Sequence, residues 1–234
     1  MPLIETLEQV RRAGRERLYP SLTNPNWLVL RKRRQLFQRW LGLLSGQNLL
    51  VLDVGGRIQP YRSLITAGRV RYVAVDPRPS PLVDLVATAE HLPLASERFD
   101  LVMCTQMLEY ATDPVQAASE IHRVLRPGGV VLLSVPSLSI RDADEDRWRF
   151  WPAGIRQLLS LFPEVEVVPE GGSVAGFFRT VNMGLYGLAR YSSVRIFLSY
   201  TIIPALNLIG FSLEKLLGSR NDTFAANYSA LARK

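Results

Sequence analysis

An unbroken apolar run followed by an acid and two glycines constrains the fold of this chain most. Residues 48–54 read Asn-Leu-Leu-Val-Leu-Asp-Val, and Gly55 and Gly56 follow directly. An apolar run without alternation is typical of a parallel strand buried on both faces. The glycines allow the backbone to approach a bound ligand closely, and Pro60 suits the first turn of a helix. The stretch therefore predicts a strand, a ligand-binding loop and a crossover helix over 60–67.

A second apolar run, 72–75 within a strand expected over 71–75, is followed by Asp76, twenty residues after Gly56. An acid at the end of the second strand of such a unit commonly binds the hydroxyls of a ribose. The two strands together predict a site for a cofactor that contains a nucleoside. A dinucleotide fingerprint requires glycines where this chain has Arg57 and Pro60, which disfavours an NAD(P)-linked oxidoreductase.

Further motifs follow in order along the chain. They read Phe99-Asp100-Leu101-Val102, then Leu108-Glu109-Tyr110, then Glu120-Ile121-His122-Arg123-Val124-Leu125-Arg126-Pro127-Gly128-Gly129. Together with the glycine loop, this pattern resembles the class I S-adenosylmethionine-dependent methyltransferases, in particular the type 11 methyltransferase-domain family, over about 48–168. The resemblance implies an α/β, Rossmann-like class I methyltransferase fold. Its sheet is mostly parallel and seven-stranded, with flanking helices and an antiparallel last strand, expected here over 224–232.

The resemblance also implies S-adenosyl-L-methionine as the cofactor and gives roles to individual residues. Those expected to bind the cofactor are Asp53, Gly55 and Gly56 at its methionine end, Asp76 at the ribose, Ala89 and Glu90 at the adenine, and Thr105, Gln106 and Leu108 at the sulfur. Glu109 and Tyr110 stand where the family has Glu-His, so they are the candidate catalytic residues. An ordinary packed side chain is the alternative for Tyr110.

The implied function is methyl transfer to a small-molecule, lipid or glycan acceptor. Residues 146–150 are similar to a segment of family members that act on glycan or other cell-envelope precursors. Four departures from the family pattern favour the alternative, a catalytically silent relative that binds cofactor or a partner protein; they are Arg57, Gln59, Thr88 and Tyr110. We expect the Arg57 side chain to point out of the glycine loop.

No metal site is expected. The chain has one cysteine, and its two histidines, His91 and His122, are far apart in sequence, whereas a structural zinc site needs four ligands. Asp142, Asp144 and Asp146 alternate as in part of a calcium loop but lack its glycine and terminal Glu in register. They are interpreted as a solvated loop that faces the substrate.

The positive charge is concentrated near the N-terminus. Residues 1–46 hold nine Lys and Arg against three Glu, out of a net charge of +7 for the whole chain. We expect a basic helical extension over 1–46, with helices over 3–18 and 26–44, and a methyltransferase domain over 47–234. The favoured interpretation is a cap over the sheet edge or the cofactor site with a solvated basic face. An anionic membrane surface is the alternative, and no nucleic-acid partner is expected because no binding module accompanies the charge.

An insertion over 171–220 precedes the last strand. Residues 196–213 within it carry no charge and are interrupted by Pro204. Their length would suit a membrane span, but both ends of the insertion must return to the same sheet. The sequence therefore predicts a helical lid or hairpin that packs on the domain, on a partner or on the membrane surface. A turn near Pro204 would lay the apolar segment 196–211 over the mouth of the substrate site.

The expected location is the cytoplasm. Cys104 is the only cysteine, so no disulfide can form within the chain, and residues near the N-terminus do not resemble a secretory signal. Residues 26–44 and 194–218 are candidates for peripheral contact with a membrane, and the expected substrate is a small or lipid-linked molecule. The sequence does not predict an oligomeric state.

Overall fold

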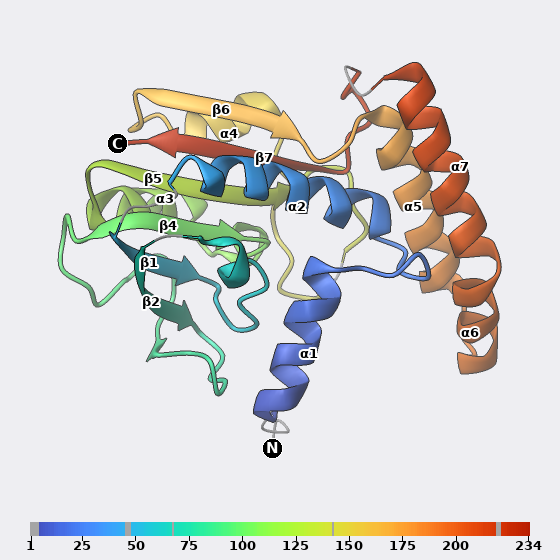
Figure 1. Ribbon diagram of the computed structural model, residues 1–234, viewed down its shortest axis with the longest axis horizontal. Helices are drawn as coiled ribbons and strands as arrows, with labels where there is room; N and C mark the ends of the chain where they lie inside the picture. Colours follow the sequence, from blue (N-terminus) through green and yellow to red (C-terminus); the bar gives the residue numbers. More distant parts are fainter. Residues whose placement is uncertain (1–4, 45–47, 67, 142, 219–220) are drawn as a thin grey trace.

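The computed structural model describes residues 5–44, 48–66, 68–141, 143–218 and 221–234, and its strands form one sheet (Figure 1). The strand order is β3-β2-β1-β4-β5-β7-β6. The strands are β1 (Asn48–Val54), β2 (Arg69–Asp76), β3 (Leu85–Val86), β4 (Phe99–Thr105), β5 (Leu125–Pro136), β6 (Glu164–Pro169) and β7 (Asn227–Arg233). Strands β1 to β5 pair in parallel, and β7 lies antiparallel between β5 and β6. The predicted Rossmann-like, mostly parallel sheet with an antiparallel last strand is confirmed.

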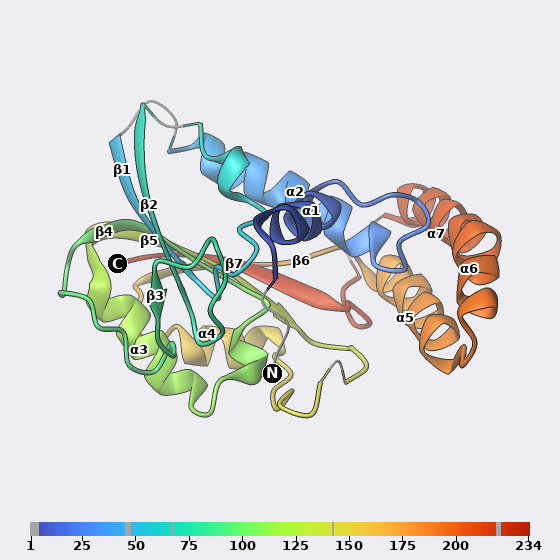
Figure 2. The same ribbon diagram turned by 90° about the horizontal axis from the view of Figure 1, so that it is seen from below.

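Helices cover both faces of this sheet, with α1 and α2 on one side and α3 and α4 on the other (Figure 2). The helices are α1 (Leu7–Leu18), α2 (Trp27–Gly42), α3 (Pro114–Val124), α4 (Pro152–Leu158), α5 (Ser173–Leu188), α6 (Ser192–Tyr200) and α7 (Ile202–Leu217), with short 3-10 helices η1 (Arg62–Leu64) and η2 (Leu108–Tyr110). Residues of β1 alternate between two cores, as the period of a strand requires. Val51 packs with Phe37 and Trp40 of α2, whereas Leu52 packs in the core that holds α3 and α4.

The predicted crossover helix over 60–67 is wrong, because only the short η1 forms there among the described residues. The reason lies in α2, which covers this face of the sheet. The Phe37 ring meets the Tyr61 ring edge-on with 4.7 Å between centroids. Since a helix distant in sequence already buries this face, the β1–β2 connection needs no long helix of its own.

The basic run of α2 is not the solvated face that the charge pattern predicted. Arg33 is buried and pairs with Glu170, its Nη2 lying 2.7 Å from Oε2. Arg31 lies over the Phe211 ring at 4.5 Å, and Arg34 lies over Tyr19 at 5.1 Å. These cations therefore connect α2 to other parts of the fold, and only part of their charge faces water.

The insertion forms a helical hairpin whose turn differs from the predicted one. Helix α5 runs out from the sheet, residues 189–191 turn the chain, and α6 and α7 return alongside (Figure 1). Pro204 lies in the first turn of α7, where the missing N–H has no intrahelical partner in any case. Glu214 of α7 accepts hydrogen bonds from the N–H groups of Gly172 and Ala175 at 2.6 and 2.8 Å, which satisfies the start of α5.

Candidate active site

A cavity of about 1070 Å³ lies at the carboxyl ends of the parallel strands. Gly55 follows β1, Asp76 ends β2 and Thr105 ends β4, and all three line it. Its opposite wall comes from α1, α2 and α5, through residues such as Arg17, Leu30 and Met183. The crevice outside the strand ends is where ligands bind in open α/β sheets. The volume exceeds what one drug-sized ligand requires, so a cofactor and a second molecule fit together.

The glycine loop is tight in the way that close backbone approach demands. Gly55 has a φ of +81°, and a Cβ there would come within 2.8 Å of Met107. A Cβ at Gly56 would come within 2.8 Å of the Asp53 carbonyl oxygen. The N–H groups of both glycines donate to the Val75 carbonyl at 2.8 and 3.1 Å. A side chain at either position would therefore collide with neighbouring residues of the protein. The loop is bare backbone at these positions, which suits a ligand held close to the main chain.

The Arg57 guanidinium pairs with Glu5, two residues before α1, and Arg57 lines the cavity. Gln59 is a residue other than glycine with a positive φ in this loop, at 43°, and its side chain donates to the Leu82 carbonyl. The family's missing glycines are thus replaced by residues that have partners of their own.

The acidic residues expected at the ribose and the adenine both line the cavity. Asp76 Oδ1 accepts the Arg78 N–H at 2.8 Å, and burial raises the pKa of this carboxyl. Glu90 Oε1 accepts the N–H groups of Thr112 and Asp113 at 2.7 and 3.3 Å. Burial alone would raise the pKa of Glu90, but these backbone donors hold it below its usual value. Ala89, directly before Glu90, also lines the cavity.

Three residues expected to line the cofactor site, Asp53, Gly56 and Leu108, are outside the cavity wall. Asp53 lies beneath the loop, where Tyr72 donates to its Oδ2 at 2.6 Å and burial raises its pKa to about 6. Leu108 is fully buried in the core shared with α3. Its neighbour Met107 lines the cavity and meets the position of a Gly55 Cβ. The sequence motif predicted the segment correctly but not which of its adjacent residues faces the ligand.

Gln106 is held at the cavity wall by the neighbouring strands. Its φ is 52°, its N–H donates to the Ser134 carbonyl at 2.8 Å, and its Nε2 lies 3.2 Å from Ser134 Oγ. The Asn227 amide of β7 lies 3.0 Å from Gln106 Oε1. A left-handed backbone at a residue other than glycine is uncommon and is typical of positions fixed by function or packing.

Glu109 is an ionisable group at this site whose pKa lies close to neutral pH. Its side chain is buried, it lines the cavity, and its Oε2 has no hydrogen-bond partner among the described residues. Burial raises the pKa of Glu109 to about 7, assisted by Asp146 and opposed by Arg17 and Arg33. A carboxyl with this pKa can accept or donate a proton near neutral pH. Tyr110 lines the same cavity, so both candidate catalytic residues lie at the site.

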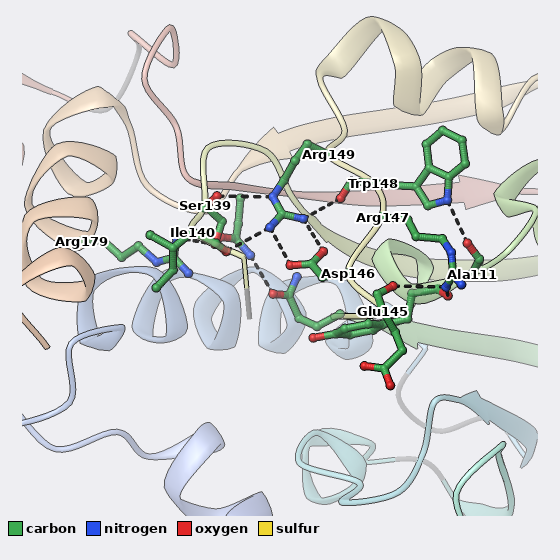
Figure 3. A network of polar contacts seen from close by, with 12 residues as sticks. Ala111, Ser139, Ile140, Glu145, Asp146, Arg147, Trp148, Arg149 and Arg179 are labelled. Atoms are coloured by element: carbon green, nitrogen blue, oxygen red, sulfur yellow. Dashed lines mark hydrogen bonds and ion pairs between the residues drawn. The ribbon is translucent and has the colours of Figure 1, made fainter. Parts of the chain in front are cut away.

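A loop over 139–151 fixes the position of these two residues (Figure 3). The N–H groups of Arg147 and Trp148 donate to the Glu109 carbonyl at 2.8 and 3.2 Å, and Trp148 Nε1 donates to the Ala111 carbonyl at 2.8 Å. Arg149 closes the loop through a two-pronged ion pair with Asp146. Asp146 is thereby removed from solvent, which corrects the prediction of a solvated acidic loop for that residue. Asp144 is exposed, and Asp142 lies outside the described residues.

The wall over the cavity is formed by the N-terminal helices and α5, not by the apolar segment 196–211 as predicted. Ala13, Glu16 and Arg17 of α1 line the cavity, and Arg179 and Met183 of α5 join them. Among the described residues of α6 and α7, none lines it. Gly14 allows α1 to lie close to the glycine loop, because a Cβ there would collide with the Ile58 carbonyl oxygen of that loop.

The histidines are separated in the structure as well as in the sequence. His91 lines the cavity beside Glu90, whereas His122 packs edge-on against Phe162 with 5.0 Å between ring centroids. The described residues contain no group of three or more His, Cys, Asp or Glu side chains that could hold a metal ion.

Residues 52–133, which include Gly55, Asp76 and Glu109 of the cavity, match the model of a methyltransferase domain. A probable S-adenosylmethionine-dependent methyltransferase from Mycolicibacterium smegmatis is 31% identical over 137 residues, which are 52% of this chain and 50% of that protein. A ubiquinone/menaquinone biosynthesis C-methyltransferase from Haemophilus ducreyi is 32% identical over 113 residues, or 48% of this chain and 38% of that protein. The chain thus spans half or less of the length of these curated relatives.

Solved structures share the fold over nearly the whole chain. A SAM-dependent methyltransferase from Archaeoglobus fulgidus superposes with a TM-score of 0.56 at 16% identity, covering 95% of this chain and 99% of that one. The cyclase SpnF superposes with a TM-score of 0.53 at 17% identity, covering 100% and 98%. A cyclase among the neighbours illustrates that the fold alone does not determine the reaction.

Proposed function

Since the chain belongs to the class I S-adenosylmethionine-dependent methyltransferases of the type 11 methyltransferase-domain family, we propose that it transfers a methyl group from S-adenosyl-L-methionine to a small-molecule or lipid-linked acceptor. The observation that carries this proposal is the cavity at the carboxyl ends of β1, β2 and β4. It combines a bare glycine cradle at Gly55 with a carboxylate at Asp76. The proposed location is the cytoplasm.

The cofactor half of the cavity consists of the strand ends. When bound there, S-adenosylmethionine supplies a methyl group on a positively charged sulfur. Gly55 leaves room for close approach of the ligand to the backbone, and Asp76 provides an acceptor for ribose hydroxyls. Thr105, Gln106 and Met107 form the adjoining wall. The residues present therefore fit the group that the family uses.

The acceptor half lies between η2 and the helices α1, α2 and α5. Holding an acceptor in attack geometry can supply most of the rate enhancement of a methyl transfer, and a base is needed only when the acceptor carries a proton that must leave. Glu109, with its pKa near 7 and its free Oε2, is the candidate for that base. Tyr110 is the candidate for orienting the acceptor.

The lining of this half combines apolar side chains, those of Val29, Ile140 and Met183, with charged ones such as Arg17 and Arg149, and it suits an acceptor with an apolar body and a polar group. The relative from Haemophilus ducreyi acts in quinone biosynthesis, and quinones are apolar molecules. The acceptor class proposed here is therefore an apolar or lipid-linked molecule that carries a hydroxyl or an acidic carbon.

A catalytically silent relative is the weaker reading. Its sequence basis was four departures from the family pattern, yet the guanidinium of Arg57 is engaged by Glu5 and Gln59 is engaged by Leu82. Arg57 lines the cavity, but its charge is already paired there. Glu109 also retains a free carboxylate oxygen at the acceptor half, which a purely structural role does not require.

Calorimetric titration separates the competing functions. We expect S-adenosylhomocysteine to bind to the purified protein and NADH not to bind. Incubation with methyl-labelled S-adenosylmethionine and fractionated cell extract should then transfer label to a molecule soluble in organic solvent. Binding of NADH alone would overturn the proposal in favour of an oxidoreductase, and binding of neither ligand would remove the cofactor assignment.

A further inference from the structure

Helices α6 and α7, which follow one another directly, expose bulky apolar side chains along their outer side. We define this outer face by Ile196, Phe197 and Tyr200 of α6 and Ile202, Ile209 and Leu216 of α7. Phe197 and Ile196 are each 60% exposed, and Leu216 is 79% exposed. Ile202, Ile209 and Leu216 are spaced by seven residues, which places them on one stripe of the helix.

The opposite side of α7 is already occupied by the protein. Ile203, Asn207, Gly210 and Glu214 are the buried residues of α7, and the Asn182 side chain of α5 donates to Asn207 at 2.9 Å. The packed side of α7 thus includes the polar residues Asn207 and Glu214, whereas its outer side exposes bulky apolar side chains to solvent. A row of exposed apolar side chains marks a surface that meets a protein partner or a membrane.

The charges around the outer face have one sign. The exposed charged residues of segment 173–218 are Arg190, Arg195 and Lys215, all cationic. The single acid of the segment, Glu214, is buried and caps the start of α5. Cations therefore stand near both ends of an apolar stripe, a pattern that matches a surface of anionic lipid. A second copy of the chain would bring the same cations together, which disfavours self-association through this face.

The position of the hairpin restricts how it could meet a membrane. The described segment Ser192–Leu217 is long and apolar enough to span one. However, α5 follows β6 directly and α7 leads back to β7, which pairs with β6. Both ends of the hairpin thus return to one sheet edge, so α6 and α7 can lie along a membrane but a single crossing is excluded.

We propose that the outer face of α6 and α7 docks on the surface of an anionic membrane, with its apolar side chains in the interface and Arg190, Arg195 and Lys215 at the lipid phosphates. Helix α5, which lines the cavity through Arg179 and Met183, packs against α7 through the Asn182–Asn207 hydrogen bond (Figures 1 and 2). Docking would therefore bring the acceptor half of the cavity within one helix of the lipid. This deepens the proposed function by naming the source of an apolar acceptor, but the docking itself does not rest on it.

The test is sedimentation of the full chain with vesicles, without cofactor. Vesicles of phosphatidylcholine alone are compared with vesicles that contain phosphatidylglycerol, at low and high salt. We expect binding to the anionic vesicles that weakens with salt, and at least tenfold weaker binding for the double variant Phe197→Asp/Ile209→Asp. Leu161→Asp is the matched control, because Leu161 is similarly exposed beyond the other end of the sheet. Arg190→Ser/Lys215→Ser should lower binding to anionic vesicles without affecting the fold.

Three outcomes would overturn the proposal. They are failure of the wild-type protein to sediment with anionic vesicles, sedimentation of the double variant like the wild type, and conversion of a dimer to a monomer by the double variant in light scattering. The last outcome would identify a second copy as the occupant of the face. Calorimetry with S-adenosylhomocysteine on each variant should give unchanged affinity, so failure of docking and failure of cofactor binding are distinguishable.

Discussion

Arg33 of α2 and Glu170 after β6 form an ion pair that is closed to solvent, with side-chain exposures of 2% and 0%. Ser134 of β5 and Ser229 of β7 each donate to Glu170 Oε1 at 2.5 Å, and Arg33 Nε donates to the same oxygen at 2.8 Å. Burial alone would lower the pKa of Arg33, but Glu170 and Tyr61 keep it above its usual value, so the buried guanidinium stays charged. Helix α2 is thereby fixed to three strands of the sheet.

Breaking this pair should destabilise the protein strongly. Arg33→Met leaves Glu170 buried without its counter-ion, which typically costs about 3–5 kcal/mol of unfolding free energy. Arg39→Ala is the control, because the Arg39–Glu166 pair is about half exposed and such pairs contribute about 0–1 kcal/mol. Urea denaturation measures both. Equal losses in the two variants would contradict the structural role given to Arg33.

Glu109 should make the stability of the protein depend on pH. Its pKa is about 7 in the folded chain, against 4.5 for an ordinary glutamate. Between about pH 4.5 and pH 7 the carboxyl is ionised in the unfolded chain but protonated in the folded one, so rising pH favours unfolding. The loss of folding free energy is complete above about pH 7. The difference corresponds to about 3 kcal/mol. Glu109→Gln should therefore stabilise the protein more at pH 8 than at pH 5, as measured by urea midpoints. A difference between the two proteins that does not change with pH would refute the assignment.

The glycine cradle gives a prediction with an internal control. Gly55→Ala puts a Cβ at a φ of +81° and within 2.8 Å of Met107, so both backbone and packing resist it. We expect lower stability and weaker binding of S-adenosylhomocysteine. Gly184→Ala, inside α5 with open space around it, should instead stabilise the protein by about 0.5–1 kcal/mol. Cofactor affinity that survives Gly55→Ala unchanged would place the ligand elsewhere.

Asp76 should hold the cofactor. Asp76→Ala removes a carboxylate that lines the cavity, and hydrogen bonds to charged groups contribute about 1.5–3 kcal/mol. Affinity for S-adenosylhomocysteine should fall about 10- to 150-fold in calorimetry. Asp144→Ala, which removes an exposed carboxylate, should leave the affinity unchanged. Equal affinities of the two variants would exclude Asp76 from the site.

Local motifs predicted the parts of the structure that depend on neighbouring residues. The apolar runs before Gly55 and Asp76 predicted the strands β1 and β2, because strands follow from short-range pattern. The order of the motifs along the chain predicted the sheet, because parallel strands are joined by a small set of connections. The same motifs brought Glu109, Tyr110, Ala89 and Gln106 to the cavity. The motifs did not predict which individual residue faces the ligand, because the choice between Leu108 and Met107 depends on the backbone turn of η2.

The remaining differences come from contacts between distant segments. The partner of Arg33 is 137 residues away, so its burial could not be read from a run of basic residues. The crossover helix after β1 is replaced by η1 because α2 covers that face. Pro204 predicts a turn, yet a proline is compatible with the first turn of a helix, and α7 begins at Ile202. The errors at Arg33 and at the crossover helix both concern which distant element covers a given surface.

Transfer of label from methyl-labelled S-adenosylmethionine to an extracted acceptor is the most direct test of methyl transfer. The wild-type protein should transfer label, Asp76→Ala should lose most of the transfer through weaker cofactor binding, and Glu109→Gln should lower the turnover rate while cofactor affinity stays the same. Asp144→Ala should behave like the wild type. A wild-type protein that binds S-adenosylhomocysteine but transfers no label to any fraction of the extract would contradict the account and favour a silent relative.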